Sequence, residues 1–459
     1  MSAVRIVMVL CGGLFLVLGP LRRPGDGDLW WQRWLGEAIL RSHMIPSRLG
    51  PETFSAPGAP WVPQEWIFSV LVAWAMQHSA FVAFSVVVSL IPAAILLSIY
   101  LRARGRASIS ATAVAMLLCA LSLVASFGIR AQVLGWVCFA AFLLAAYRRD
   151  RWFYLVVPVT VVWANLHASM MIAPVYLVLY VIGEALEGGA GALRASRALR
   201  VLPIVALAVF CTPFGWHLPA YALALSVSPI RHYINEWQPA SFKDLDFLIG
   251  ALPLALILLV GLRSSLRRKA EVLPAMALFA AAVLAKRDIP LFAIAAAPLA
   301  AAALDAILPG IQKVQLRTRE MEPFAIVAIA VVLAINGLTL VAIQRVEPPV
   351  LPVAAVAHLA NGGQASRLLC EDFSHCSLAL QYPNVRIFMD GRCDPYPVSV
   401  WKSYLTMVRA RSDWQAALAR YGVDAVVARR SGRLSAALAS SGSWHRAYRD
   451  ASFVLYKRT

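Results

Sequence analysis

Long apolar runs, repeated along most of the chain, constrain the fold more than any other feature. Runs of roughly 17–22 residues recur between short charged loops, and each is long enough to cross about 30 Å of hydrocarbon as a helix. The runs are continuous and rich in Ala and Leu, whereas the strands of a membrane barrel would alternate. The chain is 60% hydrophobic and 14% charged, against about 45–50% and 25% in soluble proteins. These features predict a polytopic α-helical membrane protein.

The basic loops between the runs predict the topology. Five loops are rich in arginine and lysine: 102–106, 148–151, 194–200, 263–269 and 313–319. Short basic loops stay in the cytoplasm, so the N-terminus lies inside and the tail after Arg345 outside. The first run ends at Arg22 and Arg23 without a small-residue cleavage motif, which indicates an uncleaved span. About eleven spans follow: 4–21, 80–101, 108–126, 131–147, 152–164, 168–187, 201–215, 247–263, 271–285, 289–308 and 323–343.

The segment 65–77 is apolar but too short to fit this scheme. Counted as a span, it would move every later basic loop to the outside, so we expect an interfacial helix on the outer leaflet. The net charge of +18 is then explained by the cytoplasmic loops, and we expect no nucleic-acid partner.

The same topology collects polar residues that lie far apart in the sequence at one membrane face. Ionisable groups at membrane depth are costly and usually functional, so we expect a shared cavity that opens outward. Taken one at a time, the residues of these outer loops have an alternative interpretation, in which they form an aromatic belt or the solvated ends of loops. The candidate site residues are Asp26, Asp28, Glu65, Arg130, Asn165, His167, His217, Glu236, Lys286 and Arg287.

The composition changes after about residue 346. Short apolar segments at 368–371, 386–389, 425–428 and 454–457 predict strands, and 399–410, 413–421 and 434–440 predict helices between them. This alternation indicates a small α/β domain. Asp390–Asp394 follows a strand, where α/β folds place binding groups, or else forms a polar turn with an internal ion pair. In an oxidising compartment Cys370 and Cys376 can form a disulfide, which leaves Cys393 over.

The residues of the first outer loop resemble those of the GT-C superfamily, in particular bacterial members related to protein mannosyltransferases. The resemblance covers most of the chain and implies a transmembrane domain over 1–345, with its first outer loop at 22–79, and an extracytoplasmic α/β domain over 346–459. It rests on Asp26–Trp31, Gly36, Ile45–Pro46, Phe54–Ser55, Trp61, Glu65–Trp66, Arg130–Gln132, Trp163–His167, Pro213–Trp216, Glu236–Trp237, Arg287–Pro290 and Asp390–Tyr396.

The resemblance implies an inverting glycosyltransferase that takes a sugar from a polyprenyl-phosphate carrier at the outer face of a bacterial inner membrane. Asp28 or Asp26 would be the general base. Cationic side chains would hold the lipid phosphate, with Arg287 the first choice because a guanidinium fork fits phosphate. A divalent metal at the two aspartates is possible, although two carboxylates one residue apart are a weak metal pattern. The glycan, lipid or protein acceptor is unknown.

Two other function classes compete with this interpretation. A transporter or flippase of a lipid-linked glycan would carry polar groups near the bilayer midplane and an internal repeat. The expected spans are nearly free of charge in their middles, and the sequence has no convincing repeat. A non-catalytic member of the fold that binds a partner through residues 346–459 is the third possibility.

Overall fold

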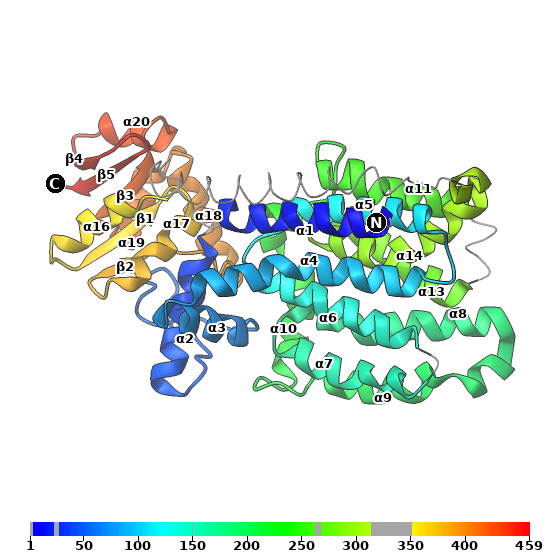
Figure 1. The fold of residues 1–459 in the computed structure, drawn as a ribbon. Helices are drawn as coiled ribbons and strands as arrows, with labels where there is room; N and C mark the ends of the chain where they lie inside the picture. The colour runs from blue at the N-terminus through cyan, green and yellow to red at the C-terminus, as the bar shows by residue number, and fades with distance from the viewer. Residues whose placement is uncertain (1–2, 23–26, 149, 262–267, 314–350) are drawn as a thin grey trace. The chain divides into compact units, whose positions relative to one another are not determined.

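Helices form wherever the sequence predicts a long apolar run within the described residues. The computed structural model describes residues 3–22, 27–148, 150–261, 268–313 and 351–459 (Figure 1). Serine residues cap two of the helices, because the Ser108 and Ser196 hydroxyls accept from backbone N–H groups one turn on. The helices are α1 Ala3–Arg22, α4 Phe81–Ala103, α5 Ile109–Val124, α6 Ala131–Ala146, α7 Val156–Ala164, α8 Ile172–Ala195, α9 Arg197–Ala208, α10 His217–Ser226, α11 Leu252–Val260, α13 Lys269–Leu284 and α14 Ile289–Ile307.

Three helical segments are long and apolar enough to cross a membrane: Phe81–Ala103, Ala168–Ala195 and Lys286–Ile307. Shorter apolar helices occupy other expected spans, so eleven crossings stay a prediction. The expected span at 201–215 begins earlier, at Arg197, and its helix ends at Ala208. The expected span at 323–343 lies outside the described residues.

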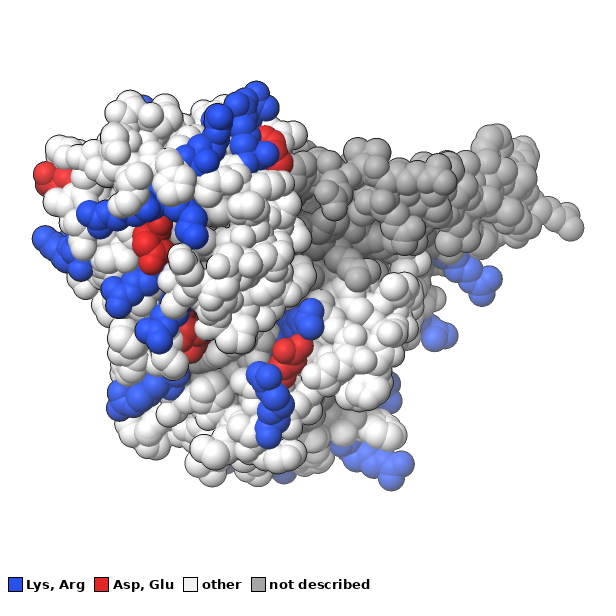
Figure 2. All heavy atoms as spheres, turned by 90° about the vertical axis from the view of Figure 1, so that its left-hand side faces the viewer, with Lys and Arg blue, Asp and Glu red and all other residues white. Residues whose placement is uncertain are grey.

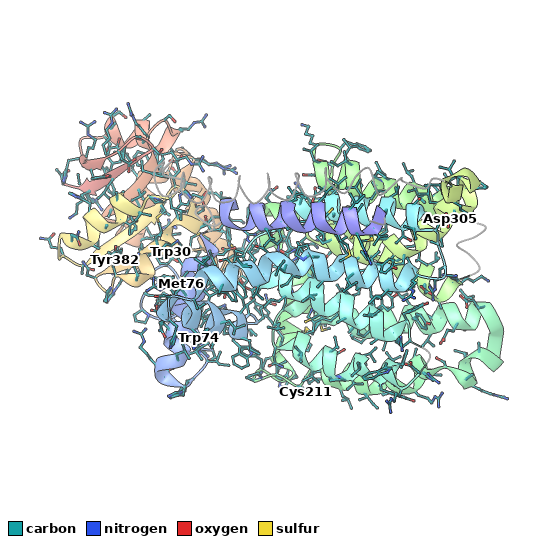
Figure 3. The ribbon with its side chains drawn as sticks, viewed as in Figure 1. Trp30, Trp74, Met76, Cys211, Asp305 and Tyr382 are labelled. Atoms are coloured by element: carbon teal, nitrogen blue, oxygen red, sulfur yellow. A yellow bond between two sulfur atoms is a disulfide. The ribbon has the colours of Figure 1, made fainter. Side chains whose placement is uncertain are left out.

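The described helices group by their contacts into a helical unit, which takes in the described parts of Met1–Leu21, Ser85–Ser226 and Ile234–Leu340. Helix α14 is buried along most of its length and packs against α5, α11 and α13. Its many alanines let neighbouring backbones approach closely. Near its end, Asp305, which is labelled in Figure 3, accepts from Ser108 N at 2.5 Å and Ser108 Oγ at 2.6 Å. These bonds join α14 to the start of α5.

A proline inside α14 explains one buried charge. Pro298 has no N–H, so the carbonyl of Ile294, four residues earlier, loses its helical partner. Arg102 supplies the missing donor, with Nη1 2.9 Å from Ile294 O and Nη2 3.4 Å from Ala295 O. The side chain of Arg102 is buried, and these two bonds tie α4 to α14.

The second unit, which we call the mixed unit, takes in the described parts of Arg22–Phe84, Val227–Tyr233 and Val341–Thr459. Its sheet has the order β2-β1-β3-β5-β4, in which β2, β1 and β3 are parallel and β5 runs antiparallel to both β3 and β4. The strands are β1 Ser366–Cys370, β2 Val385–Ile387, β3 Ala425–Arg429, β4 Trp444–Arg449 and β5 Phe453–Arg458. Four of them confirm the sequence prediction.

The helices of the C-terminal part are α16 Val353–Asn361, α17 Phe373–Cys376, α18 Val398–Val408, α19 Trp414–Tyr421 and α20 Arg433–Ala439. Helices α18, α19 and α20 lie at the three ranges that the sequence predicted. Strand β4 was not predicted, because its side chains are mostly polar and only partly buried. It is an edge strand, and its position depends on backbone pairing with β5 rather than on an apolar pattern.

The first loop, which contains α2 Asp28–Ser42 and α3 Trp66–Gln77, adds to this sheet. Thr53 pairs in parallel with Ile387 of β2. Phe54 N donates to Ile387 O at 3.0 Å, and Ile387 N donates to Glu52 O at 2.8 Å. The loop therefore belongs with the C-terminal sheet by its contacts, whereas the linear sequence suggested a division at residue 345.

The structure contains the disulfide that the sequence left open. Cys370 at the end of β1 is bonded to Cys376 in α17, with 5.6 Å between the Cα atoms, and Cys393 takes no part in it. On the face seen in Figure 2, basic side chains stand in separate groups among uncharged residues, with acidic side chains beside several of them. That face therefore has no continuous basic stripe.

Candidate functional site

Asp28 lies in the first turn of α2, where the positive end of the helix dipole favours a carboxylate. The side chain is half-buried, and Trp31 Nε1 lies 3.3 Å from its Oδ1. The backbone of Gly391 approaches so closely that a Cβ there would overlap Asp28 Oδ1. The loop after β2 therefore lies directly against this carboxylate. Asp26, the alternative base, lies outside the described residues.

Glu65, at the start of α3, belongs to a hydrogen-bonded chain between α2 and α3. Gln32 Nε2 donates to the Glu65 carboxylate, and Ser69 Oγ donates to Gln32 Oε1. Gln32 and Ser69 are both buried, so these bonds satisfy polar groups that would otherwise be costly. The two helices approach closely because Gly36 has no side chain where it meets the Ser69 carbonyl.

The Asp390–Asp394 segment is a polar turn with an internal ion pair, the second of its two predicted interpretations. Arg392 and Asp390 side chains are both fully buried and paired at 2.8 Å. Arg392 also reaches Glu52 Oε1 at 3.1 Å and Thr53 Oγ1 at 3.0 Å. Tyr396 Oη donates to Asp390 Oδ1 at 3.1 Å. Arg392 is thus a structural cation that holds the first loop to the sheet.

Asp394, in the same turn, was not among the candidate site residues predicted from the sequence. Burial raises the pKa of its carboxyl well above the usual range, and the carboxylates of Glu65 and Asp28 raise it further. Three carboxyl groups from distant parts of the sequence therefore interact within the mixed unit. The sequence pointed toward Asp394 only through its position after a strand and through the Asp390–Tyr396 resemblance. Its two acidic neighbours are more than 300 residues away in the chain.

A group of cationic side chains lies in the helical unit, at the start of α6 and just after the end of α13. Arg130, just before α6, forms an ion pair with Glu236. Arg287, just after α13, stacks on Trp237, with its Cζ 4.2 Å from the ring centre. Gln132 Nε2 lies 3.4 Å from Arg287 O, which brings the two segments together. The structure therefore brings Arg130, Glu236 and Arg287 close together.

Arg287 differs from the other candidate cations in its partners. Its half-buried guanidinium forms no ion pair with a carboxylate among the residues that the structure describes. Lys286 is bound to Asp244 at 2.8 Å and to Asn235 Oδ1 at 3.2 Å. A guanidinium that stacks on an aromatic ring and keeps its fork available is suited to bind an anion.

His167 lies near this group but carries no charge at neutral pH. Burial, with the positive charge of Arg287 as the second cause, lowers the pKa of its imidazole to about 3. Ser169 N donates to His167 Nδ1 at 3.1 Å, and Ser169 Oγ lies 2.8 Å from the same atom. The ring can act as a hydrogen-bonding group, and the positive charge of the group resides on the arginines.

Two further predicted residues have other surroundings. Asn165 Nδ2 donates to Val161 O at 2.9 Å and to Cys211 O at 2.8 Å, which closes the end of α7. His217 is exposed at the start of α10, with its ring 4.0 Å from that of Trp216. Among the described residues, no three His, Cys, Asp or Glu side chains are grouped to hold a metal ion.

Several solved structures are similar to this chain. No family model and no curated protein sequence matches the chain. The archaeal oligosaccharyltransferase AglB from Archaeoglobus fulgidus, in complex with an inhibitory peptide and a dolichol-phosphate, is similar over 98% of this chain and 74% of its own, with a TM-score of 0.55 and 13% identity. The apo oligosaccharyltransferase of the same organism is similar over 93% of this chain and 69% of its own, with a TM-score of 0.58 and 12% identity.

A shorter neighbour matches along almost its whole length. ArnT from Cupriavidus metallidurans, bound to undecaprenyl phosphate, is similar over 99% of this chain and 97% of its own, with a TM-score of 0.53 and 14% identity. At these identities the likeness concerns the fold.

Proposed function

Because the chain has the fold of the GT-C membrane glycosyltransferases, we propose that it transfers a sugar from a polyprenyl-phosphate-linked donor to an acceptor at the extracytoplasmic face. The observation that carries the proposal is this fold, shared over nearly the whole chain with two proteins solved with polyprenyl-type phosphates. Asp28 and Arg287, at two different places in the chain, supply the residue types that such a reaction needs.

In the proposed reaction the acceptor hydroxyl loses its proton to a first-loop carboxylate, that of Asp28 or Asp26. The acceptor oxygen bonds to the anomeric carbon while the bond from that carbon to the phosphate oxygen breaks. The polyprenyl phosphate leaves with the electron pair, and attack from the opposite side inverts the configuration. Asp28 supports this role because its carboxylate is half-buried at a helix N-terminus beside the loop after β2.

The departing phosphate needs positive charge, and Arg287 is the residue we propose for it. Its guanidinium is oriented by the Trp237 ring and forms no ion pair among the described residues. Arg130, already paired with Glu236, would assist. His167 would donate a hydrogen bond as a neutral ring.

We place the reaction at the extracytoplasmic face of a bacterial inner membrane, with the N-terminus of the chain in the cytoplasm. The Cys370–Cys376 disulfide supports this orientation of the C-terminal part, because disulfides persist in oxidising compartments. The basic loops support the same orientation.

The test is a panel of polyprenyl-phosphate sugars offered to the purified full chain, with binding and transfer both measured. We expect Asp28→Asn to bind a donor and to lose turnover by roughly 10²–10⁴-fold, the usual contribution of a general base. Arg287→Ala should weaken donor binding, and Arg287→Lys should restore only part of it, because an ammonium lacks the planar fork.

Asp413→Asn is the matched control for the aspartate, because Asp413 is exposed just before α19 and should leave transfer unchanged. Asp26→Asn separates the two candidate bases. If Asp28→Asn and Asp26→Asn both keep full turnover, the proposed base is wrong. If no donor binds the wild type, the transfer function itself is wrong.

A further inference from the structure

A large charged cavity lies in the helical unit, at the opposite ends of the helices that hold Arg130 and Arg287. Arg130 and Tyr147 flank the two ends of α6, and Arg268 lies just before α13 while Arg287 follows its other end. The cavity has a volume of about 1100 Å³, and Tyr147 and Arg268 line it. In Figure 3, Asp305 and Cys211 lie toward different ends of this unit. The cavity lies at the end of the helical unit that contains the predicted cytoplasmic loops, because residues of those loops line it.

Five arginines and four acidic residues line the cavity, and the acidic residues already have protein partners. Glu271 accepts from Arg106 Nη1 at 2.7 and 2.8 Å. Asp150 accepts from Arg148 at 2.7 Å, and Glu187 accepts from the backbone N–H of Ala270 at 2.8 Å. Glu184 accepts from the Ser196 hydroxyl. These bonds leave the four carboxylates committed to protein donors.

Arg102 is a lining cation whose charge is not matched by an ion pair among the described residues. Its side chain is 3% exposed, and its hydrogen bonds go to the neutral carbonyls of Ile294 and Ala295. Glu271, the acidic residue nearby, is held by Arg106. A buried charge without a counter-ion is costly, so an anion in the cavity would lower the free energy of this arrangement.

Arg268 gives a second, independent observation. Its Nη1 atom is buried and has no hydrogen-bond partner among the described residues. Buried polar atoms are almost always hydrogen-bonded in folded proteins, and an unsatisfied one requires an explanation such as a missing ligand. Two guanidinium groups therefore border the same cavity: Arg102 of α4, whose charge has no ion-pair partner among the described residues, and Arg268 at the start of α13, whose Nη1 has no hydrogen-bond partner there.

We propose that this cavity binds a phosphate group, carried either by an anionic lipid of the inner leaflet or by a soluble phosphate ester. Guanidinium groups bind phosphate through paired N–H donors. Basic pockets between transmembrane helices at the cytoplasmic side are suited to lipid headgroups. The proposed binding is separate from sugar transfer, so its test needs no sugar donor.

The experiment measures binding of three probes to the delipidated full chain in a neutral detergent, by native mass spectrometry and by titration. The probes are dioctanoyl phosphatidylglycerol, dioctanoyl phosphatidylcholine and inorganic pyrophosphate. We expect saturable binding of an anionic probe and none of phosphatidylcholine. Arg268→Gln should weaken the binding by roughly tenfold or more, the usual effect of losing a charge-assisted hydrogen bond.

Arg194→Gln is the matched control. Arg194 lies exposed in the last turn of α8, within the same basic loop region but outside the cavity lining, so its loss removes equal charge. The affinity of the Arg194→Gln variant for the anionic probe should equal that of the wild type. If Arg268→Gln does not fold, Arg268→Lys, which keeps the charge but not the fork, should show an intermediate loss.

The outcomes distinguish the two possible sources of the phosphate and also show when the proposal fails. Binding of phosphatidylglycerol alone supports a lipid headgroup, and binding of pyrophosphate alone supports a soluble phosphate. Equal weakening in Arg268→Gln and Arg194→Gln would mean diffuse surface attraction and would overturn the proposal. Failure of both anionic probes to saturate the wild type would overturn it as well.

Discussion

Arg392 carries a buried charge whose partners come from two distant segments of the chain. Asp390 lies in its own turn, whereas Glu52 and Thr53 belong to the first loop. The Trp34 and Trp61 rings lie 5.1 and 5.0 Å from the guanidinium carbon. A buried ion pair of this kind is weak evidence for stability in itself, but the loss of one partner leaves the other charge unmatched.

We therefore expect Arg392→Gln to lower the free energy of unfolding of the mixed unit by roughly 3–5 kcal/mol, because the Asp390 carboxylate stays buried. The measurement is the thermal unfolding midpoint of the full chain in detergent. Arg430→Gln, at an exposed position after β3, should shift the midpoint little. In the double variant Asp390→Asn/Arg392→Gln the loss should be smaller than the sum of the single losses. Strict additivity would contradict the pairing.

At the scale of elements, α2 and α3 depend on one close approach. A Cβ at Gly36 would overlap the Ser69 carbonyl and the Ala73 side chain. Because Ser69 also holds Gln32, which donates to Glu65, this packing fixes the position of a candidate site residue. Gln32 in α2 and Glu65 at the start of α3 are 33 residues apart in the sequence. Only the packing of the two helices brings their side chains together.

Gly36→Ala should destabilise the mixed unit by roughly 1–3 kcal/mol, the usual cost of overpacking. The better helix propensity of alanine, about 1 kcal/mol, acts in the opposite direction. We expect the clash to win because the obstacle is a backbone carbonyl that cannot rotate away. Gly442→Ala is the control, since nothing lies within 4 Å of a Cβ there. Thermal unfolding compares the two, and a stabilised Gly36→Ala would show that the helices separate at little cost.

At the scale of the whole molecule, two features support one orientation in the membrane. The basic loops predict a cytoplasmic side, and the Cys370–Cys376 disulfide favours an oxidising environment for the C-terminal part. The candidate base and the candidate phosphate-binding arginine belong to different units, the mixed unit and the helical unit.

Cysteine labelling with a membrane-impermeant maleimide tests the orientation. In a background with Cys211→Ser and Cys393→Ser, we expect Arg430→Cys to react in intact cells. Arg104→Cys, in an exposed position after α4, should react only after permeabilisation. Cys370 and Cys376 should react only after reduction. Labelling of Arg104→Cys from outside would reverse the predicted topology.

The helices were predictable because each apolar run carries its own signal: a length, a composition and a charged boundary. The four apolar strands were predictable for the same local reason, whereas the sequence left the Cys370–Cys376 disulfide open. Strand β4 was not, because its pairing with β5 does not require apolar side chains.

In the candidate site, too, the sequence predicted some features and only the tertiary structure decided others. Asp28, Glu65 and Arg287 were recognisable as polar residues in unusual places, since the sequence shows residue type and predicted depth. The strand pairing of the first loop with β2, the Asp394 neighbourhood and the unsatisfied Arg268 depend on which distant segments meet. Packing decides those contacts, and burial then sets their pKa shifts and hydrogen-bond balance, neither of which a linear pattern contains.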